Sequence, residues 1–259
     1  MNVARPAGLV LAAGGSLRLG EAKQLLPYRG RTLLDATLDM ARACGFSELL
    51  VAVGGSAAEV RARVDLTGCT VVENPDFSTG CGSSIRSAVR YVSAPSLVLL
   101  LGDQPGVAPA SVARLAAVTT PIGICAYGDG LGHPFLFRRR VYADLASLHG
   151  DKAVWKLLHS GRHPVTEVPI DGPIPLDVDT RDDYERLLSE AAPPASPASP
   201  SSAAPLASPA PVPGAASLSG STPLSGSASL PGSASLSGSA SLSGSASLSG
   251  SASLSDAGR

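Results

Sequence analysis

A glycine-rich stretch near the start of the chain carries one hydroxyl and two cationic side chains, those of Ser16, Arg18 and Lys23. It follows a short apolar run over residues 9–12, which has the length and composition of a buried parallel strand. Gly14 and Gly15 have no Cβ, so backbone N–H groups there can approach a phosphate closely. The arginine and the lysine add positive charge. The stretch therefore predicts a polyphosphate-binding loop at the end of a strand.

Two familiar phosphate-binding motifs do not fit this stretch. A P-loop requires Lys and then Ser or Thr directly after its final glycine, whereas Gly20 is followed by Glu21 and Ala22. A dinucleotide fingerprint requires G-x-G-x-x-G, and the adjacent glycines at 14 and 15 break that spacing. An NAD-dependent oxidoreductase would also need an acidic residue after the second strand, where residues 54–56 read Gly-Gly-Ser. The spacing thus argues against both classes.

The pattern over residues 11–23 is Leu-Ala-Ala-Gly-x-Ser-x-Arg-x-Gly-x-x-Lys. It resembles the signature loop of the MobA-like nucleotidyltransferases, which transfer a nucleotide from an NTP to a phosphorylated acceptor. An ordinary glycine-rich turn is the alternative. The resemblance implies catalytic roles for Arg18 and Lys23. It also implies nucleotide binding by the following loop residues: Leu11, Ala12, Ala13, Gly14, Gly15, Ser16, Arg18 and Lys23.

A carboxylate follows the most apolar run of the chain. Residues 97–101 are expected to form a central strand, and Gly102 and Asp103 come directly after it. Ligands of open α/β sheets bind beyond the carboxyl ends of strands, and Mg²⁺ prefers a carboxylate with phosphate oxygens and waters. A turn aspartate before Gln-Pro is the alternative. The stretch resembles the family's Gly-Asp-x-Pro motif, which implies that Gly102 and Asp103 bind nucleotide and that Asp103 is catalytic and binds the metal.

A second glycine-rich segment, residues 78–86, leads into a helix expected to start near Ser83. Ser83 or Ser84 as a simple helix N-cap is the alternative. In the family this loop lies near the base and the acceptor, which implies nucleotide binding by Gly82 and Ser83 and substrate binding by Ser84 and Arg86. Relatives commonly have Gly-Met where this chain has Gly80-Cys81, which leaves the base open.

Two further segments resemble the molybdenum cofactor cytidylyltransferases. They are Gly-Leu-Gly-His-Pro at residues 130–134 and Leu-His-Gly-Asp-Lys at residues 148–152, and the first implies that His133 contacts substrate. The chain departs from that pattern at residues 154–156, where Val-Trp-Lys replaces Gly-Ala-Arg, and Trp155 is expected to narrow or reshape the acceptor pocket. Without the resemblance, His133 is a turn residue and Trp155 a helix core residue.

Asp177 and Asp179 precede the last helix of the folded part, and period-two alternation places both carboxylates on one side. The stretch resembles the family's Asp-Ile-Asp-Thr-Pro, with Arg181 in place of proline. One of the two, with Asp179 preferred, is expected to be the second metal ligand. Capping of the terminal helix by Asp179 or Thr180 is the alternative, and both roles are compatible.

Composition limits the location and the partners. The 259 residues carry a net charge of −1, which predicts neither a nucleic-acid surface nor a basic membrane patch. No apolar run has the length of a membrane span, and no signal peptide is evident, so a cytoplasmic location is expected. The four cysteines form no C-x-x-C pair and have no zinc-ligand spacing with the four histidines, which predicts free thiols.

A change in composition near Ala192 divides the chain. Residues 193–255 contain no charged residue, and a Ser-Ala-Ser-Leu-Ser-Gly-like hexapeptide recurs within them. Such a mixture cannot bury enough apolar surface to offset chain entropy. We therefore expect an NTP transferase domain over residues 1–191 and a disordered tail over residues 192–259.

Strand-like and helix-like segments alternate within residues 1–191, which predicts an α/β domain with a mostly parallel sheet. The resemblance implies a Rossmann-like, three-layer sandwich of the GT-A nucleotidyltransferase type. Strands are predicted at 9–12, 49–53, 70–73, 97–101, 122–127 and 135–137. Helices are predicted at 32–44, 57–64, from 83, from 109, and at 141–148, 153–159 and 181–189.

The resemblance implies a nucleotidyltransferase that uses Mg²⁺, an NTP and a phosphorylated small-molecule acceptor. CTP and a molybdopterin-type molybdenum cofactor are the favoured pair, with a molybdoenzyme or its chaperone as the receiving partner and no nucleic-acid or membrane partner. GTP, or a sugar phosphate or phospholactate acceptor, is the alternative within the class. A non-catalytic nucleotide-binding or cofactor-delivery protein is the alternative outside it.

Overall fold

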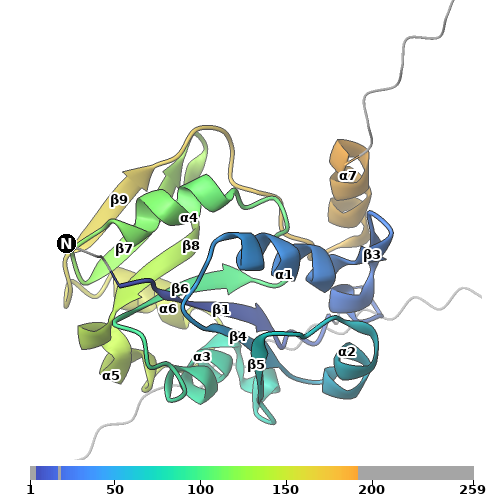
Figure 1. Cartoon of the computed structure of the whole chain (residues 1–259), viewed down its shortest axis with the longest axis horizontal. Coiled ribbons are helices and arrows are strands. Elements are labelled where there is room, and N and C mark those ends of the chain that lie inside the picture. Colours follow the sequence, from blue (N-terminus) through green and yellow to red (C-terminus); the bar gives the residue numbers. More distant parts are fainter. Residues whose placement is uncertain (1–3, 17–18, 192–259) are drawn as a thin grey trace, which may run out of the picture. The chain divides into compact units, whose positions relative to one another are not determined.

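The computed structural model describes residues 4–16 and 19–191 (Figure 1). Their centre is a seven-stranded sheet in the order β5-β4-β1-β6-β8-β7-β9. Its strands are β1 (Ala7–Ala12), β4 (Leu49–Val53), β5 (Cys69–Glu73), β6 (Ser96–Leu101), β7 (Ile122–Tyr127), β8 (Gly130–Arg138) and β9 (Val165–Pro169). Only β8 among them runs antiparallel to its neighbours. The mostly parallel sheet and the central place of residues 97–101 are confirmed.

Helices cover both faces of the sheet because its strands are apolar on both sides. Within β1, Leu9 packs on one face and Val10 on the other, and both are fully buried. The Leu9 face packs against α3 (Cys81–Val89), α5 (Tyr142–Leu145) and α6 (Ala153–Leu158). The Val10 face packs against α1 (Leu33–Ala43), α2 (Ala57–Arg63) and α4 (Pro109–Ala116), of which α1 and α4 lie on the near side in Figure 1. The predicted three-layer α/β arrangement is confirmed.

The last helix, α7 (Arg181–Ala191), packs on a small hairpin of β2 (Pro27–Tyr28) and β3 (Arg31–Thr32). Tyr184 Oη donates a hydrogen bond of 2.5 Å to the carbonyl oxygen of Pro27, and Val178 is fully buried in the same apolar cluster. This cluster brings residues 177–179 next to the segment that follows the first glycine-rich loop.

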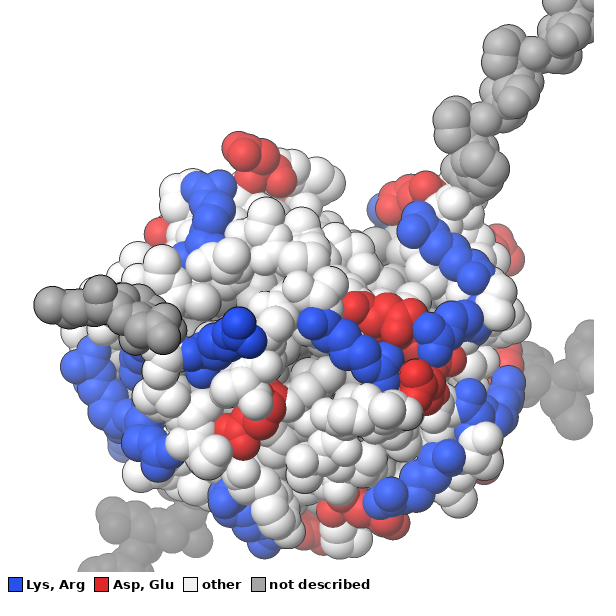
Figure 2. All heavy atoms as spheres, viewed as in Figure 1, with Lys and Arg blue, Asp and Glu red and all other residues white. Residues whose placement is uncertain are grey.

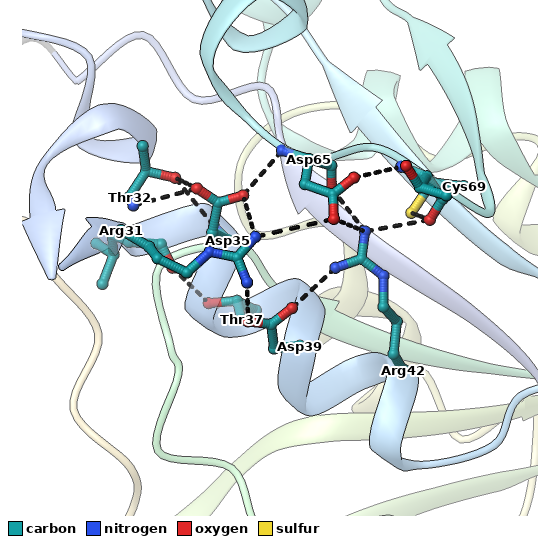
Figure 3. Close-up of polar contacts among 10 residues, drawn as sticks. Arg31, Thr32, Asp35, Thr37, Asp39, Arg42, Asp65 and Cys69 are labelled. Atoms are coloured by element: carbon teal, nitrogen blue, oxygen red, sulfur yellow. Dashed lines mark hydrogen bonds and ion pairs between the residues drawn. The ribbon is translucent and has the colours of Figure 1, made fainter. Parts of the chain in front are cut away.

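Helix α1 begins where the sequence predicts. Thr32 and Asp35 form a capping box, in which Thr32 Oγ1 accepts from the Asp35 N–H and the Asp35 carboxylate accepts from the Thr32 N–H. On the outer side Arg31 contacts both Asp35 and Asp39 (Figure 3). Asp35 Oδ1 also accepts from the N–H of Asp65 at 2.8 Å. These contacts fix α1 to the loop before β5.

The start of α3 differs from the prediction. The helix begins at Cys81 with Gly80 as its N-cap, not near Ser83. Gly80 has φ +104°, a conformation that glycine adopts without strain. The turn into the helix therefore lies two residues earlier than the sequence predicts. Ser83 and Ser84 are therefore inside the helix, and neither caps it.

Charged residues of both signs are interspersed on the face shown in Figure 2. No helix in the described ranges is long and apolar enough to cross a membrane. The four cysteines are free thiols, as expected. The predicted tail from residue 192 and the predicted site residue Arg18 lie outside the described residues.

Candidate active site

A cleft of about 740 Å³ opens at the carboxyl ends of β1 and β6. Parallel strands end at the same edge of a sheet, so the loops after β1 and β6 face one another there. The start of α3 and the segment before α7 close the other sides. The cleft is lined by Leu11, Ala12, Ala13, Gly14, Gly15, Lys23, Gln24, Phe77, Ser78, Gly80, Cys81, Ser84, Leu101, Gly102, Asp103, Asp151, Asp177 and Asp179.

Two side-chain contacts hold the first glycine-rich loop in shape. Ser16 Oγ accepts a 2.9 Å hydrogen bond from the N–H of Lys23, which closes the loop on itself. Gln24 Nε2 donates to the carbonyl oxygens of Ala12 at 2.9 Å and Gly14 at 3.0 Å. Gln24 is only 2% exposed, so its carboxamide fixes the loop backbone from within the fold. Sequence reasoning missed Gln24, although a polar residue just before the buried Leu25 and Leu26 is a usable signal.

The ammonium group of Lys23 lies between two carboxylates of the cleft. Its Nζ is 2.5 Å from Asp103 Oδ2 and 2.8 Å from Asp179 Oδ1. Burial disfavours the charged lysine, but the two carboxylates outweigh it, and the pKa of Lys23 is raised. Burial, together with the charge of Asp103, raises the pKa of Asp177. Among the described residues, the cleft therefore gathers several carboxylates around the Lys23 ammonium group.

The carboxylates of Asp103 and Asp179 suit a hard divalent cation. Both present an oxygen to the same point, and carboxylate oxygens are the donors that Mg²⁺ and Mn²⁺ prefer. Within residues 4–16 and 19–191, no group of three or more His, Cys, Asp or Glu side chains is arranged to hold a metal ion. A cation bound here would take its remaining ligands from substrate phosphates and water, as Mg²⁺ commonly does.

The backbone around Asp103 is fixed by the neighbouring elements. The N–H of Gly102 donates to the carbonyl oxygen of Leu11 at 2.9 Å, and a Cβ at position 102 would lie 2.9 Å from that same oxygen. Thr37 Oγ1, fully buried on α1, is 3.1 Å from the carbonyl oxygen of Gly102. Glycine is thus needed at 102 for close approach of the two loops, and α1 positions the residue before Asp103.

The wall opposite Lys23 is built from two segments far apart in sequence. The N–H of Gly82 donates to the carbonyl oxygen of Gly150 at 3.1 Å, and Cys81 Sγ donates to the carbonyl oxygen of Asp151 at 2.8 Å. Burial and the nearby Asp151 carboxylate raise the pKa of the Cys81 thiol. Asn74 Nδ2, from the loop after β5, donates to Ser84 Oγ at 2.9 Å.

Residues 8–165, more than half of the chain, match the MobA-like NTP transferase domain. The chain belongs to the MobA-like NTP transferase family.

Relatives that are similar to this chain carry names that describe different activities. Nicotine blue oxidoreductase of Paenarthrobacter nicotinovorans is 38% identical over 136 residues, 51% of this chain and 66% of that protein. Molybdenum cofactor cytidylyltransferase of Escherichia coli is 27% identical over 179 residues, 68% of this chain and 92% of that protein. The crystal structure of Rv0371c from Mycobacterium tuberculosis in complex with manganese superposes with a TM-score of 0.65 at 51% identity. It covers 73% of this chain and 100% of that one.

Most of the residues singled out from the MobA-like motifs meet at the cleft. Leu11, Ala12, Ala13, Gly14, Gly15, Lys23, Ser84, Gly102, Asp103 and Asp179 line it. Ser16 supports the loop through Lys23 without lining the cleft. Arg18 lies outside the described residues. Phe77 was not predicted, because nothing local to it indicates that it faces the loops. Asp151 was not named as a site residue either, although it belongs to the family-like segment at residues 148–152.

Four predicted MobA-like site residues are not among those that line the cleft. Gly82 packs against residue 149, where a Cβ would lie 2.8 Å from the backbone nitrogen, and the fully buried Ser83 accepts a hydrogen bond from Asn74. Arg86 contacts the carbonyl oxygen of Leu148 and forms an ion pair with an aspartate. His133 packs on Phe135 with ring centroids 4.1 Å apart. None of the four lines the cleft.

Trp155 does not line the cleft. Its ring packs edge-on against Phe135, 5.5 Å between centroids, and stacks on His159. It is partly buried and packs against the apolar cluster on the Leu9 face of the sheet, as a helix core residue does. Its effect on an acceptor pocket therefore stays a prediction.

Proposed function

We propose that the chain is a nucleotidyltransferase that moves CMP from CTP to the phosphate of a molybdopterin-type molybdenum cofactor and releases pyrophosphate. The observation that carries this proposal is the grouping of Lys23, Asp103 and Asp179 beside a glycine-rich loop in one cleft. The choice of CTP and of this acceptor is supported by the 27% identity to molybdenum cofactor cytidylyltransferase, which spans 92% of that protein.

The chemistry needs positioning and charge compensation but no general base. An oxygen of the acceptor phosphate, already ionised at pH 7, attacks the α-phosphorus. The new P–O bond forms as the bond to the bridging oxygen breaks, and pyrophosphate leaves with the electron pair. Residues 13–15, Arg18 and Lys23 would hold the triphosphate, while Asp103 and Asp179 would hold Mg²⁺. The bound Mg²⁺ would neutralise charge on the phosphate oxygens.

The test is pyrophosphate release by the full chain with Mg²⁺ and molybdenum cofactor, with CTP, GTP, ATP and UTP offered separately. Release with CTP above the others is expected, and Asp103→Asn should abolish it while circular dichroism stays unchanged. Release with GTP instead would replace the cytidylyl assignment by a guanylyl one. Silence with all four nucleotides on the folded protein would refute transfer to this acceptor.

The match to nicotine blue oxidoreductase, 38% identical over 136 residues, favours a second candidate. That match spans just under two thirds of the relative's length. The same cleft would then bind a nucleotide cofactor for a redox reaction. Oxidation of NADH or NADPH in the presence of an organic dye would support this candidate, and no oxidation with either cofactor would remove it.

Location and delivery are proposed with the main function. We expect a cytoplasmic protein that passes its product to a molybdoenzyme or its chaperone. Cell fractionation tests the first expectation, and co-purification of a molybdoenzyme with the tagged chain tests the second.

A further inference from the structure

We propose that Lys23 is the resident counter-ion of Asp103 and Asp179, and that its ammonium group must leave these carboxylates before they accept a divalent cation. The inference rests on the proposed function, because it concerns the same cleft. Its consequence is that the nucleotide-free protein binds metal weakly, and that metal enters together with a triphosphate that gives Lys23 another anion to bind.

The geometry makes lysine and metal competitors. Nζ lies 2.5 Å from Asp103 Oδ2 and 2.8 Å from Asp179 Oδ1, so one cation already engages both carboxylates. The Lys23 side chain is 18% exposed and that of Asp103 is 9% exposed, so water screens this pair poorly, whereas the Asp179 side chain is 53% exposed and its charge is screened more. A divalent ion on the same oxygens would meet a positive charge at contact distance.

The structure also provides a short path for the lysine. Its backbone is fixed, since the N–H of Lys23 donates to Ser16 Oγ at 2.9 Å. Its stem runs along the first loop, because a Cβ at Gly14 would lie 3.8 Å from Lys23 Cε. Rotation of the flexible side chain alone can therefore carry the ammonium from the carboxylates toward phosphates held by residues 13–15.

The test is a Mn²⁺ titration of the nucleotide-free full chain, with free Mn²⁺ measured by electron paramagnetic resonance. Lys23→Met should bind Mn²⁺ at least about tenfold more tightly than the wild-type protein, because a contact cation is removed. Lys156→Met, which removes an exposed lysine of α6, controls for net charge and should leave the affinity unchanged. The gain should vanish in Lys23→Met combined with Asp103→Asn.

Equal or weaker Mn²⁺ binding by folded Lys23→Met would overturn the inference. Circular dichroism checks the fold, and Lys23→Gln carries the same comparison if the methionine variant does not fold. The readout is independent of turnover. A failed pyrophosphate assay would therefore refute the proposed transferase reaction and leave this comparison standing, whereas an unchanged Mn²⁺ affinity would refute only the role of Lys23.

Discussion

Gln104 Nε2 donates a hydrogen bond of 2.5 Å to the carbonyl oxygen of Pro175. The donor directly follows Asp103, and the acceptor lies four residues before Asp179. Gln104 is 2% exposed, so water cannot replace this bond readily. The contact ties together the two segments that bring the carboxylates of the cleft to the same cation.

Gln104→Met should therefore weaken both the fold and the use of metal. The substitution keeps the length of the side chain but leaves the Pro175 carbonyl without its donor, which should cost about 1–3 kcal/mol of unfolding free energy. Because the segment carrying Asp179 is released, half-maximal pyrophosphate release should need more Mg²⁺. Urea unfolding and a Mg²⁺ titration of turnover measure the two effects.

Ser189→Ala is the control for Gln104→Met. It removes an exposed hydrogen bond to the carbonyl oxygen of Glu185 within α7, and should change stability by less than about 0.5 kcal/mol. An unchanged Mg²⁺ requirement in Gln104→Met would show that Pro175 does not position Asp179.

Gly80→Ala should open the wall of the cleft opposite Lys23. An added Cβ would lie 2.5 Å from the carbonyl carbon of Gly150 and 2.6 Å from the nitrogen of Asp151, where backbone cannot move cheaply. Gly68 provides a control for a positive φ without overpacking, because it has φ +75° with nothing within 4 Å of a Cβ. Gly80, with φ 104° and ψ 166°, lies in a region that essentially only glycine adopts. Gly68→Ala should cost only the backbone strain of about 1 kcal/mol.

Overpacking and the less favourable backbone conformation should together add at least about 1–3 kcal/mol in Gly80→Ala. Its affinity for an NTP should also fall, while that of Gly68→Ala stays at the wild-type value. Chemical unfolding measures the loss of stability in each variant, and titration calorimetry measures the loss of nucleotide affinity. Equal losses of stability in Gly80→Ala and Gly68→Ala would mean that the backbone of residues 150–151 shifts to make room for the added methyl group.

Local sequence patterns were enough to predict the strands and helices whose buried residues form continuous runs or recur at a regular spacing. The strands at 49–53 and 122–127 were predicted at their observed bounds, because continuous apolar runs mark strands buried on both faces. Leu34, Leu38 and Ala41 are fully buried on α1, as their helical spacing predicts. Lys23 and Asp103, singled out from two separate motifs, line the same cleft.

Features that depend on distant partners could not be predicted in this way. Strand β9 lies at the sheet edge, with Val165 37% exposed, and so has no apolar run. The carboxamides of Gln24 and Gln104 act on carbonyl groups of other segments, and no local pattern specifies those partners. His133 lies within a family motif, yet in the structure its ring packs on Phe135.

Asp179→Asn should impair catalysis far more than Asp177→Asn. Both carboxylates line the cleft, but the structure brings Asp179 to the cation that also contacts Asp103. Loss of a metal ligand should lower kcat/KM by at least about 100-fold at limiting Mg²⁺, whereas Asp177→Asn should keep most of the activity. A larger loss of kcat/KM in Asp177→Asn than in Asp179→Asn would assign the metal ligand to Asp177 instead.

His133 should make the protein less stable as pH falls from about 6.5 toward 4. Burial lowers the pKa of this imidazole from 6.5 to about 4, so between these values the unfolded chain binds a proton that the folded protein does not. Stability from the neutral ring is present above pH 6.5 and is lost as pH falls through 4, by up to about 3 kcal/mol.

Urea unfolding of the wild-type protein, His133→Leu and His149→Gln across this pH range tests the effect of His133. The pH-dependent loss should be smaller in His133→Leu, where only the carboxyl groups with lowered pKa values, such as Asp35 and Asp144, still contribute. It should persist in full in His149→Gln, which changes an exposed histidine. The comparison uses the slope of stability with pH, so any packing cost of the leucine cancels. The same slope in the wild-type protein and His133→Leu would mean that the folded protein protonates His133 readily. A charged imidazole at that position would again be a candidate to bind the acceptor phosphate, the role that the Gly-His-Pro motif implies.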